Sequence, residues 1–306
     1  MSTFVFQRLI HGLIVVLGVT VIVFFVTRII GDPVQVMLPV EATLEERQLL
    51  ESQLGLDRPI AEQFVEFVRD VAVFDFGESL WQRRPAMEVV LERLPMTALL
   101  TLAGIGSAIV LAIPLGILAA LRPGSLVDRV ISVASITGLS LPQFWLGLLL
   151  IVYFGVQMRW FPTSGARGPI YIVLPALTLA LPSLARLIVV VRTAVIDEMH
   201  QQYTKVARAK GLSIRRVAGV HALRNAMVPI LTLSGWEVIG AFAGNVVVVE
   251  TVFAWPGLGQ TIMQAIERQD LILLQATVFT VAIIAVGINL IIDIVHRLVD
   301  PRVRFG

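Results

Sequence analysis

Long apolar runs constrain this chain more than any other feature of its sequence. A helix needs about 20 mostly apolar residues to cross roughly 30 Å of hydrocarbon. Six stretches meet this requirement, at residues 9–30, 94–121, 130–156, 172–196, 229–252 and 271–295. The sequence therefore predicts an all-α integral membrane protein with six transmembrane helices.

The first apolar run is preceded by Arg8, as the core of a signal peptide would be preceded by a basic residue. Its length exceeds that of a signal-peptide core, and no small-residue cleavage pattern follows it. We therefore expect this segment to be retained as a membrane anchor.

The composition also fits a protein that faces lipid rather than water. Of the 306 residues, 57% are hydrophobic and 15% are charged, and the mean hydropathy is +0.85. A soluble domain would carry about 25% charged residues. The chain has no cysteine, which excludes a disulfide framework and thiolate metal sites, and its net charge of +2 gives no indication of a nucleic-acid partner.

The distribution of charge predicts how the chain is oriented. Residues 31–93 hold thirteen acidic side chains and six arginines, whereas residues 197–224 hold six basic side chains and two acidic ones. Basic loops remain in the cytoplasm, so with alternating spans both termini are expected to be cytoplasmic. The predicted organisation is an N-terminal transmembrane helix (1–30), an extracytoplasmic helical segment (31–93), a five-helix core (94–296) with a cytoplasmic loop (197–228), and a cytoplasmic tail (297–306).

The extracytoplasmic segment carries two helical patterns. Leucines recur at helical spacing over residues 44–54, Gly55 follows, and a second apolar face runs from Phe64 to Val71. We predict two short helices on the outer surface. They are either a connector that packs on the spans or a surface that binds a partner.

Helix-breaking residues interrupt several predicted spans. Pro114, Pro142, Pro175 and Pro182 each remove a backbone hydrogen bond in a medium without water. Residues 240–244 read GAFAG, a spacing of small residues that lets another helix approach closely. Ordinary helix packing accounts for these features, and a cavity beside them is the alternative.

Polar residues inside the spans are more informative, because a charge at the centre of a membrane helix costs about 2.5 to 3.5 kcal/mol. Arg186 and Glu237 are the clearest cases, and Asn245 follows in the same span as Glu237. They could pair across adjacent helices, or line a translocation path for a zwitterionic solute. Arg192 and Asp293 lie nearer the inner ends of their spans, where extension of the side chain toward the interface is a sufficient explanation.

No residue pattern predicts catalysis. The four histidines are scattered without metal-ligand spacing, and neither a G-x-x-x-x-G-K-[ST] phosphate loop nor a G-x-S-x-G elbow is present. We therefore expect no enzymatic activity and no cofactor bound by this chain.

The loop at 197–228 is expected to form a helix, a sharp turn and a second helix. Asp197 and Glu198 suit the N-terminus of a helix over 197–210, and Gly211 suits the left-handed position after its end. Ser213 is a candidate N-cap for the second helix, and Pro229 then opens the fifth span. Three interpretations compete: a DNA-reading motif, a connector resting on anionic lipid, and a rigid element that docks on a cytoplasmic partner. Attachment to a span at both ends argues against the first.

The same loop resembles the EAA loop of permease subunits of bacterial ABC importers, specifically the dipeptide, oligopeptide and nickel group. Residues 203–212 read YTKVARAKGL and residues 221–229 read HALRNAMVP, while Lys205 stands where the general pattern has glutamate. Similar motifs extend along the chain as GDP (31–33), LGLDRP (54–59), FGES (76–79), ERLPMT (92–97), LPQFWLGLLL (141–150), VVVETVFAWPGLG (247–259) and DPRVR (300–304).

The resemblance implies a B-type permease with the type I importer fold, in the bacterial cytoplasmic membrane. Its expected partners are a homologous second permease, two ATPase subunits that bind ATP and Mg²⁺, and an extracytoplasmic binding protein that delivers peptides or a related solute such as glutathione, a nickel chelate or an opine. The residues implied in coupling to the ATPases are Glu198, Tyr203, Ala207, Arg208, Ala209, Lys210, Gly211, Leu212, Arg224 and Asn225. An ion- or proton-coupled secondary transporter that uses Arg186 and Glu237 is the alternative.

Overall fold

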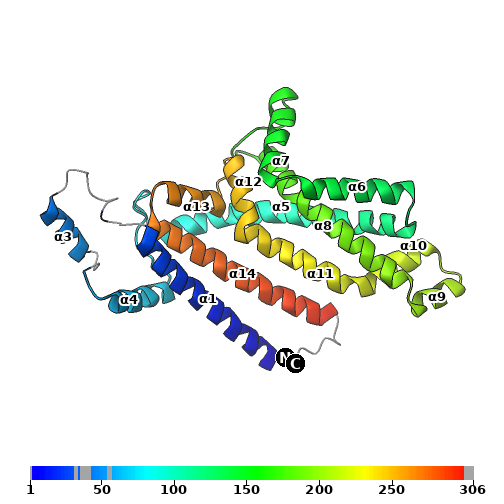
Figure 1. The fold of residues 1–306 in the computed structure, drawn as a ribbon, viewed down its shortest axis with the longest axis horizontal. Helices are drawn as coiled ribbons and strands as arrows, with labels where there is room; N and C mark the ends of the chain where they lie inside the picture. Colours follow the sequence, from blue (N-terminus) through cyan, green and yellow to red (C-terminus); the bar gives the residue numbers. More distant parts are fainter. Residues whose placement is uncertain (1, 31–33, 35–42, 54–56, 300–306) are drawn as a thin grey trace. The chain divides into compact units, whose positions relative to one another are not determined.

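A computed structural model describes residues 2–30, 34, 43–53 and 57–299, and these residues are almost entirely helical (Figure 1). The predicted GDP motif at 31–33, Gly55 and the DPRVR motif at 300–304 lie outside the described residues. The helices are α1 (Ser2–Ile30), α3 (Leu44–Gln53), α4 (Ile60–Ala72), α5 (Ala86–Leu121), α6 (Leu126–Ser140), α7 (Gln143–Leu150), η1 (Ile151–Gln157), η2 (Pro169–Ile172), α8 (Val173–Met199), α9 (Gln202–Ala209), α10 (Ile214–Arg216), η3 (Val217–Ala222), α11 (Leu223–Gly240), η4 (Ala241–Asn245), α12 (Val246–Val252), α13 (Leu258–Glu267) and α14 (Leu271–Val299).

The lengths of the apolar helices agree with a multi-pass membrane protein. Over the described ranges, five helices are long and apolar enough to cross a bilayer, and a sixth span is obtained when a bent helix pair is counted as one. The helices predicted over 172–196 and 271–295 appear as α8 and α14 with boundaries a few residues apart. Helix α5 begins at Ala86, earlier than the predicted Leu94.

The third predicted span is a pair of helices bent at Pro142, one of the helix-breaking residues named from the sequence. Helices α6 and α7 meet at an angle of 104°. Leu141, which precedes Pro142, is extended at φ −88° and ψ 125°, as the proline ring requires of its neighbour. Pro142 has no N–H to continue the helix of the preceding residues, and α7 begins immediately after it.

The fifth span also differs from its prediction. The helix does not begin at Pro229: helical backbone runs without interruption from Ile214 through η3 into α11, and Pro229 lies inside α11. The GAFAG stretch forms most of the π-helix η4, and nothing within the described chain lies within 4 Å of a Cβ placed at Gly244. The predicted close helix contact is therefore not made at Gly244 by the described residues, whereas Ala241 of the same stretch is buried.

The chain divides into two compact units, of which the first comprises residues 1–97 and 256–286. Its core contains Ala86, Val89 and Val90 from the start of α5, together with Leu258 and Leu273. Both helices of the predicted 31–93 segment are present. Helix α3 begins with a capping box, in which the Thr43 N–H donates to Glu46 Oε2 (2.8 Å) and the Glu46 N–H donates to Thr43 Oγ1 (3.3 Å).

Helix α4 packs against α1 through aromatic rings. The Phe24 ring lies 5.2 Å from the Phe64 ring and 5.4 Å from the Phe67 ring, measured between centroids. Both α4 rings belong to the apolar face predicted from the sequence. The segment therefore packs on a span of its own unit, as the connector interpretation requires, and a partner-binding role for its outer face stays a prediction.

The second unit comprises residues 98–255 and 287–306, and α8 runs through its centre beside α6 and α11 (Figure 1). Glycine lets α5 approach α8 closely, because a Cβ at Gly116 would lie 2.5 Å from Val191 Cγ1. Nearby, Val191 and Val195 form a buried cluster with Ala218, Ala222, Ala226 and Ile230 of η3 and α11. The end of α8 is thus packed on both sides.

Candidate functional site

The loop predicted to dock on a partner, residues 197–228, runs in the second unit from the end of α8 through α9, α10 and η3 into the start of α11. The prediction of one helix over 197–210 was wrong, because Asp197 and Glu198 belong to the last turn of α8 and a new helix, α9, begins at Gln202. The N–H groups of His200 and Gln201 close α8 with bonds to the Asp197 and Glu198 carbonyls (3.2 and 3.1 Å). Gln201 then turns to an extended conformation. Acidic side chains at a helix C-terminus oppose the helix dipole, so Asp197 and Glu198 are placed there at an energetic cost.

The break after α9 is the one that the sequence predicts. Gly211 has φ +84°, its N–H bonds to the Arg208 carbonyl (2.9 Å), and the Leu212 N–H bonds to the Ala207 carbonyl (3.3 Å). These two bonds define a Schellman motif, which satisfies the last carbonyls of α9. Ser213 occupies the N-cap position of α10 with an extended backbone but makes no side-chain capping bond. The helix, turn, helix arrangement is confirmed and its geometry is fixed by hydrogen bonds.

Tyr203 connects α9 to both helices that flank the loop. Its phenol donates a hydrogen bond to Glu198 at the end of α8. Burial raises the pKa of Tyr203, the bond to Glu198 raises it further, and a hydrogen bond with Asn225 of α11 acts in the opposite direction. The phenol therefore stays protonated and serves as a neutral donor. Three residues of the predicted coupling set, Glu198, Tyr203 and Asn225, lie together.

The other predicted coupling residues separate into buried and exposed groups. Ala207 is 8% exposed and packs inward, together with the fully buried Thr204. The outward face of the loop carries exposed side chains on α9 and α10, with Val206 53% and Ile214 44% exposed. The exposed basic residues of this surface are Lys205, Arg208, Lys210, Arg215 and Arg216. Ala209 of α9 and Arg224 and Asn225 of α11 are also exposed.

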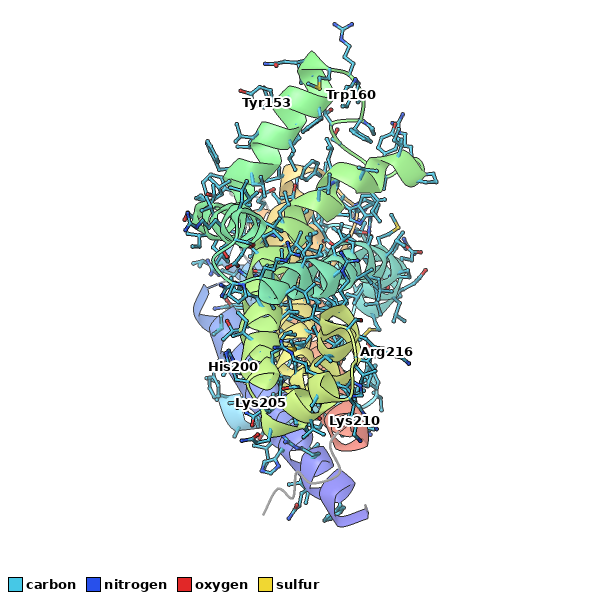
Figure 2. All side chains as sticks on the ribbon, turned by 90° about the vertical axis from the view of Figure 1, so that its right-hand side faces the viewer. Tyr153, Trp160, His200, Lys205, Lys210 and Arg216 are labelled. Carbon is cyan, nitrogen blue, oxygen red and sulfur yellow. The ribbon has the colours of Figure 1, made fainter. Side chains whose placement is uncertain are left out.

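Figure 2 shows Lys205, Lys210 and Arg216 near the end of the second unit where α9 and α10 lie. Tyr153 and Trp160 lie at its other end. Beside the loop, a groove of about 390 Å³ is lined by the end of α8 and the start of α11, including Thr193, Asp197 and Pro229. The loop thus presents a basic, partly apolar surface next to this groove.

The predicted charges inside the spans form an ion pair between α8 and α11. Arg186 Nε and Nη2 donate to the two carboxylate oxygens of Glu237 at 2.5 and 2.7 Å, and Ser183 Oγ donates to the second oxygen at 2.6 Å. The Glu237 side chain is 6% exposed, whereas that of Arg186 is 39% exposed. Asn245 makes no hydrogen bond to this cluster among the residues that the structure describes. The pairing alternative is therefore confirmed for Arg186 and Glu237.

A second ion pair was not predicted from the sequence. Arg192, which was attributed to extension toward the interface, donates to both carboxylate oxygens of Asp128 at 2.5 and 2.8 Å. Asp128 lies in the first turn of α6, whose N-cap Ser125 accepts from the Asp128 N–H (3.3 Å). A capping pattern of serine followed three residues later by an acidic residue marks the helix start in the sequence. Nothing in the sequence marks Arg192 as the partner of Asp128.

The WPGLG stretch forms a turn beside a helix. Trp255 is 2% exposed, and Gly257 is the N-cap residue of α13. A packing role accounts for this stretch.

Two family models match the chain, one over residues 112–305, described as the inner membrane component of binding-protein-dependent transport systems, and one over residues 1–101, described as the N-terminal part of the membrane component. Curated relatives match over the full length. The chain is 34% identical to the oligopeptide transport system permease protein AppB of Bacillus subtilis, with 100% of each chain covered. It is 35% identical to the di/tripeptide transport system permease protein DppB of Pseudomonas aeruginosa, with 99% of each covered.

The glutathione transport system permease protein GsiC of Escherichia coli K12 is 34% identical, again with 100% of each chain covered. Among solved structures, the methionine ABC transporter MetNI in inward-facing conformations matches with TM-scores of 0.57 and 0.59, at 19% and 20% identity. Both matches cover 70% of this chain and 97% of the other, and they show the type I ABC importer fold. The chain therefore belongs to the family of inner-membrane permease components of binding-protein-dependent transport systems, as a multi-pass protein of the bacterial inner membrane.

Proposed function

We propose that this permease imports peptides, or a related small solute such as glutathione, a nickel chelate or an opine, and that the loop from Asp197 to Val228 couples it to two ATPase subunits. The relatives whose names mention oligopeptides, di/tripeptides and glutathione support the solute class. The Schellman turn at Gly211, which joins α9 to the helical backbone that continues from α10 into α11, is the observation that carries the coupling role. A homologous second permease and an extracytoplasmic binding protein complete the proposed complex.

The loop has the properties that mechanical coupling requires. Its outward side chains, Val206 and Ile214, are apolar and half exposed, so they are available to a groove on a partner. Arg208 and Lys210 surround them with positive charge, which steers an acidic partner surface. On the inward side, Tyr203 bonds to the end of α8 and to α11, so a force on α9 reaches both spans.

For the translocation path we propose Arg186 and Glu237, with Asn245 further along the same helical segment. Arg186 lies near the middle of α8, so lipid exposure of a guanidinium that is 39% exposed would be costly. This face of α8 and α11 is therefore expected to line an aqueous path or the second permease. The Nη1 group of Arg186 makes no hydrogen bond within the described residues and is available to a solute carboxylate.

Two variants test the coupling role in the complete complex, co-expressed with the second permease, the ATPases and the binding protein. Gly211→Pro removes an N–H that bonds to Arg208, and Tyr203→Asp places a carboxylate beside Glu198. Both are expected to lower solute-stimulated ATP hydrolysis at least about tenfold while the permease still inserts. Val220→Ala is the matched control, because Val220 is exposed in the same loop but lies on η3, away from the exposed faces of α9 and α10.

Two results would overturn the proposal. Purification of the permease without any ATPase, with uptake driven by an ion gradient, would favour the secondary-transporter alternative. Unaltered solute-stimulated hydrolysis in both variants would remove the coupling role from this loop. Mass spectrometry of the solute carried by the cognate binding protein identifies the substrate independently.

A further inference from the structure

We propose that Asp128 and Arg192 are positioning residues that fix α6 to the loop-bearing end of α8, so that α6 moves with the loop during each ATPase cycle. The proposal rests on the coupling function proposed above. It assigns to the two residues, referred to here as the Asp128–Arg192 pair, the step that passes motion from the loop into the bent α6–α7 segment.

The hydrogen bonds of Asp128 fix the direction of this link. Its Oδ1 accepts from Arg192 Nε (2.5 Å) and Ser132 Oγ (3.3 Å), and its Oδ2 accepts from Arg192 Nη2 (2.8 Å) and the Gly124 N–H (2.8 Å). Each carboxylate oxygen of Asp128 thus accepts two hydrogen bonds, and the side chain is 5% exposed. A two-bond fork between guanidinium and carboxylate sets orientation as well as distance, which a lysine could not reproduce.

Arg192 lies where it can receive motion from the loop. It precedes Met199, the last residue of α8, by roughly two helical turns. Its neighbours Val191 and Val195 pack against Ala218 and Ala222 of η3, the helix through which the chain returns from the loop. The same two turns of α8 are therefore held by η3 on one side and by α6 on another.

Beyond the pair, the contact between α6 and α8 is apolar. A cavity of about 330 Å³ opens between the two helices, lined by Val130 and Ala134 of α6 and by Leu184 and Ile188 of α8, among other apolar residues. Apolar contacts are non-directional, so they specify the position of α6 along α8 less sharply than a two-bond ion pair does. The Asp128–Arg192 pair lies at one end of this cavity and supplies the directional contact.

Stability alone is a poor explanation for an ion pair at this position. Replacing a buried pair by well-packed apolar side chains is often neutral or stabilising. What the pair provides is a fixed geometry between two helices. Because α6 ends at the 104° bend before α7, a displacement of α6 also changes where α7 begins.

Transport measurements on the complete complex in vesicles test the pair. In Asp128→Asn, the permease, ATPases and binding protein are expected to assemble, and ATP hydrolysis to continue, while solute transported per ATP hydrolysed falls about fivefold or more. Arg192→Lys, which keeps the charge but loses the fork, is expected to lower the ratio by a smaller factor. Ser132→Ala removes only the longest bond to the carboxylate and is the matched control, with an unchanged ratio.

The absence of cysteine in the chain allows a second measurement with paired spin labels. Labels at Val133 on α6 and Gln202 on α9, both exposed, report whether the two elements move together. In the otherwise unaltered complex we expect the distribution of distances between the two labels to stay unchanged on ATP binding. In Asp128→Asn we expect it to shift or broaden.

The outcomes separate this inference from the proposed function. An unchanged transport-to-hydrolysis ratio in Asp128→Asn, or a fall in transport that only follows the amount of assembled complex, would overturn the role of the pair while ATPases remain bound to the loop. Failure of the ATPases to bind the unmutated permease would instead overturn the proposed function.

Discussion

At the scale of single residues, two arginines of α8 each pair with a nearly buried carboxylate. The Glu237 and Asp128 side chains are 6% and 5% exposed, and each accepts two bonds from an arginine of α8. Each carboxylate also accepts from a serine hydroxyl. Since neither lipid nor a protein core solvates an isolated charge, the two pairs place strict limits on substitution at these four positions.

Breaking the Arg186–Glu237 pair is expected to be more harmful than removing it. Arg186→Met leaves Glu237 buried without its partner, which should destabilise the folded permease by about 3–5 kcal/mol, whereas Arg186→Met combined with Glu237→Leu should recover most of that loss. Thermal unfolding in detergent measures the stabilities. The double variant is expected to remain defective in transport if the pair lines the path, and normal uptake would assign the pair a purely structural role.

At the scale of helices, prolines have different effects that depend on their surroundings. Pro142 separates α6 from α7, whereas Pro182 and Pro229 lie inside α8 and α11 without ending them. In a bilayer a helix that lost its remaining hydrogen bonds would find no water to replace them, which favours continuation through a proline. At Leu141 the backbone is extended, and the chain changes direction there.

Replacing Pro142 tests whether the proline causes the bend. In Pro142→Ala the backbone can continue as a helix, and labels at the exposed Val133 and Val152 should move apart toward about 28 Å, the separation in a straight helix. Double electron–electron resonance between the two spin labels measures this distance. An unchanged distance would show that packing of α7 in its unit, rather than Pro142, maintains the bend.

The sequence predicted those elements whose signals are local. Apolar run length located α8 and α14 within a few residues, and the left-handed Gly211 followed from its position after a helical pattern. Asp197 and Glu198 were assigned to the wrong helix because a favourable N-terminal placement was assumed, while α8 in fact continues past them. The Asp128–Arg192 pair joins positions far apart in the chain, and no periodicity or motif connects such positions.

At the scale of the whole molecule, the second unit has two chemically different ends. The basic loop occupies one end, and Tyr153 and Trp160, 51% and 61% exposed, occupy the other (Figure 2). Basic residues remain in the cytoplasm, and exposed tyrosine and tryptophan are enriched at membrane interfaces. The exposed aromatic side chains mark a membrane interface, and the basic loop predicts that its own end is the cytoplasmic one, with residues 158–160 outside.

Labelling from each side of the membrane checks this orientation. Because the chain has no cysteine, single variants provide the only thiol. Trp160→Cys is expected to react with a membrane-impermeant thiol reagent in intact cells, and Gln202→Cys only after the membrane is permeabilised. The reverse pattern would invert the proposed topology and remove the loop from the cytoplasm.

Contact between the loop and an ATPase subunit is the central claim. Val206→Cys places a single thiol on the exposed face of α9, and a short bifunctional thiol reagent in the assembled complex should join it to a cysteine introduced in the ATPase groove. The account predicts a cross-linked permease–ATPase product whose yield changes with ATP, and little product from the control Val220→Cys. A complex that imports solute at the normal rate but gives equal or no cross-linking at these two positions would contradict it.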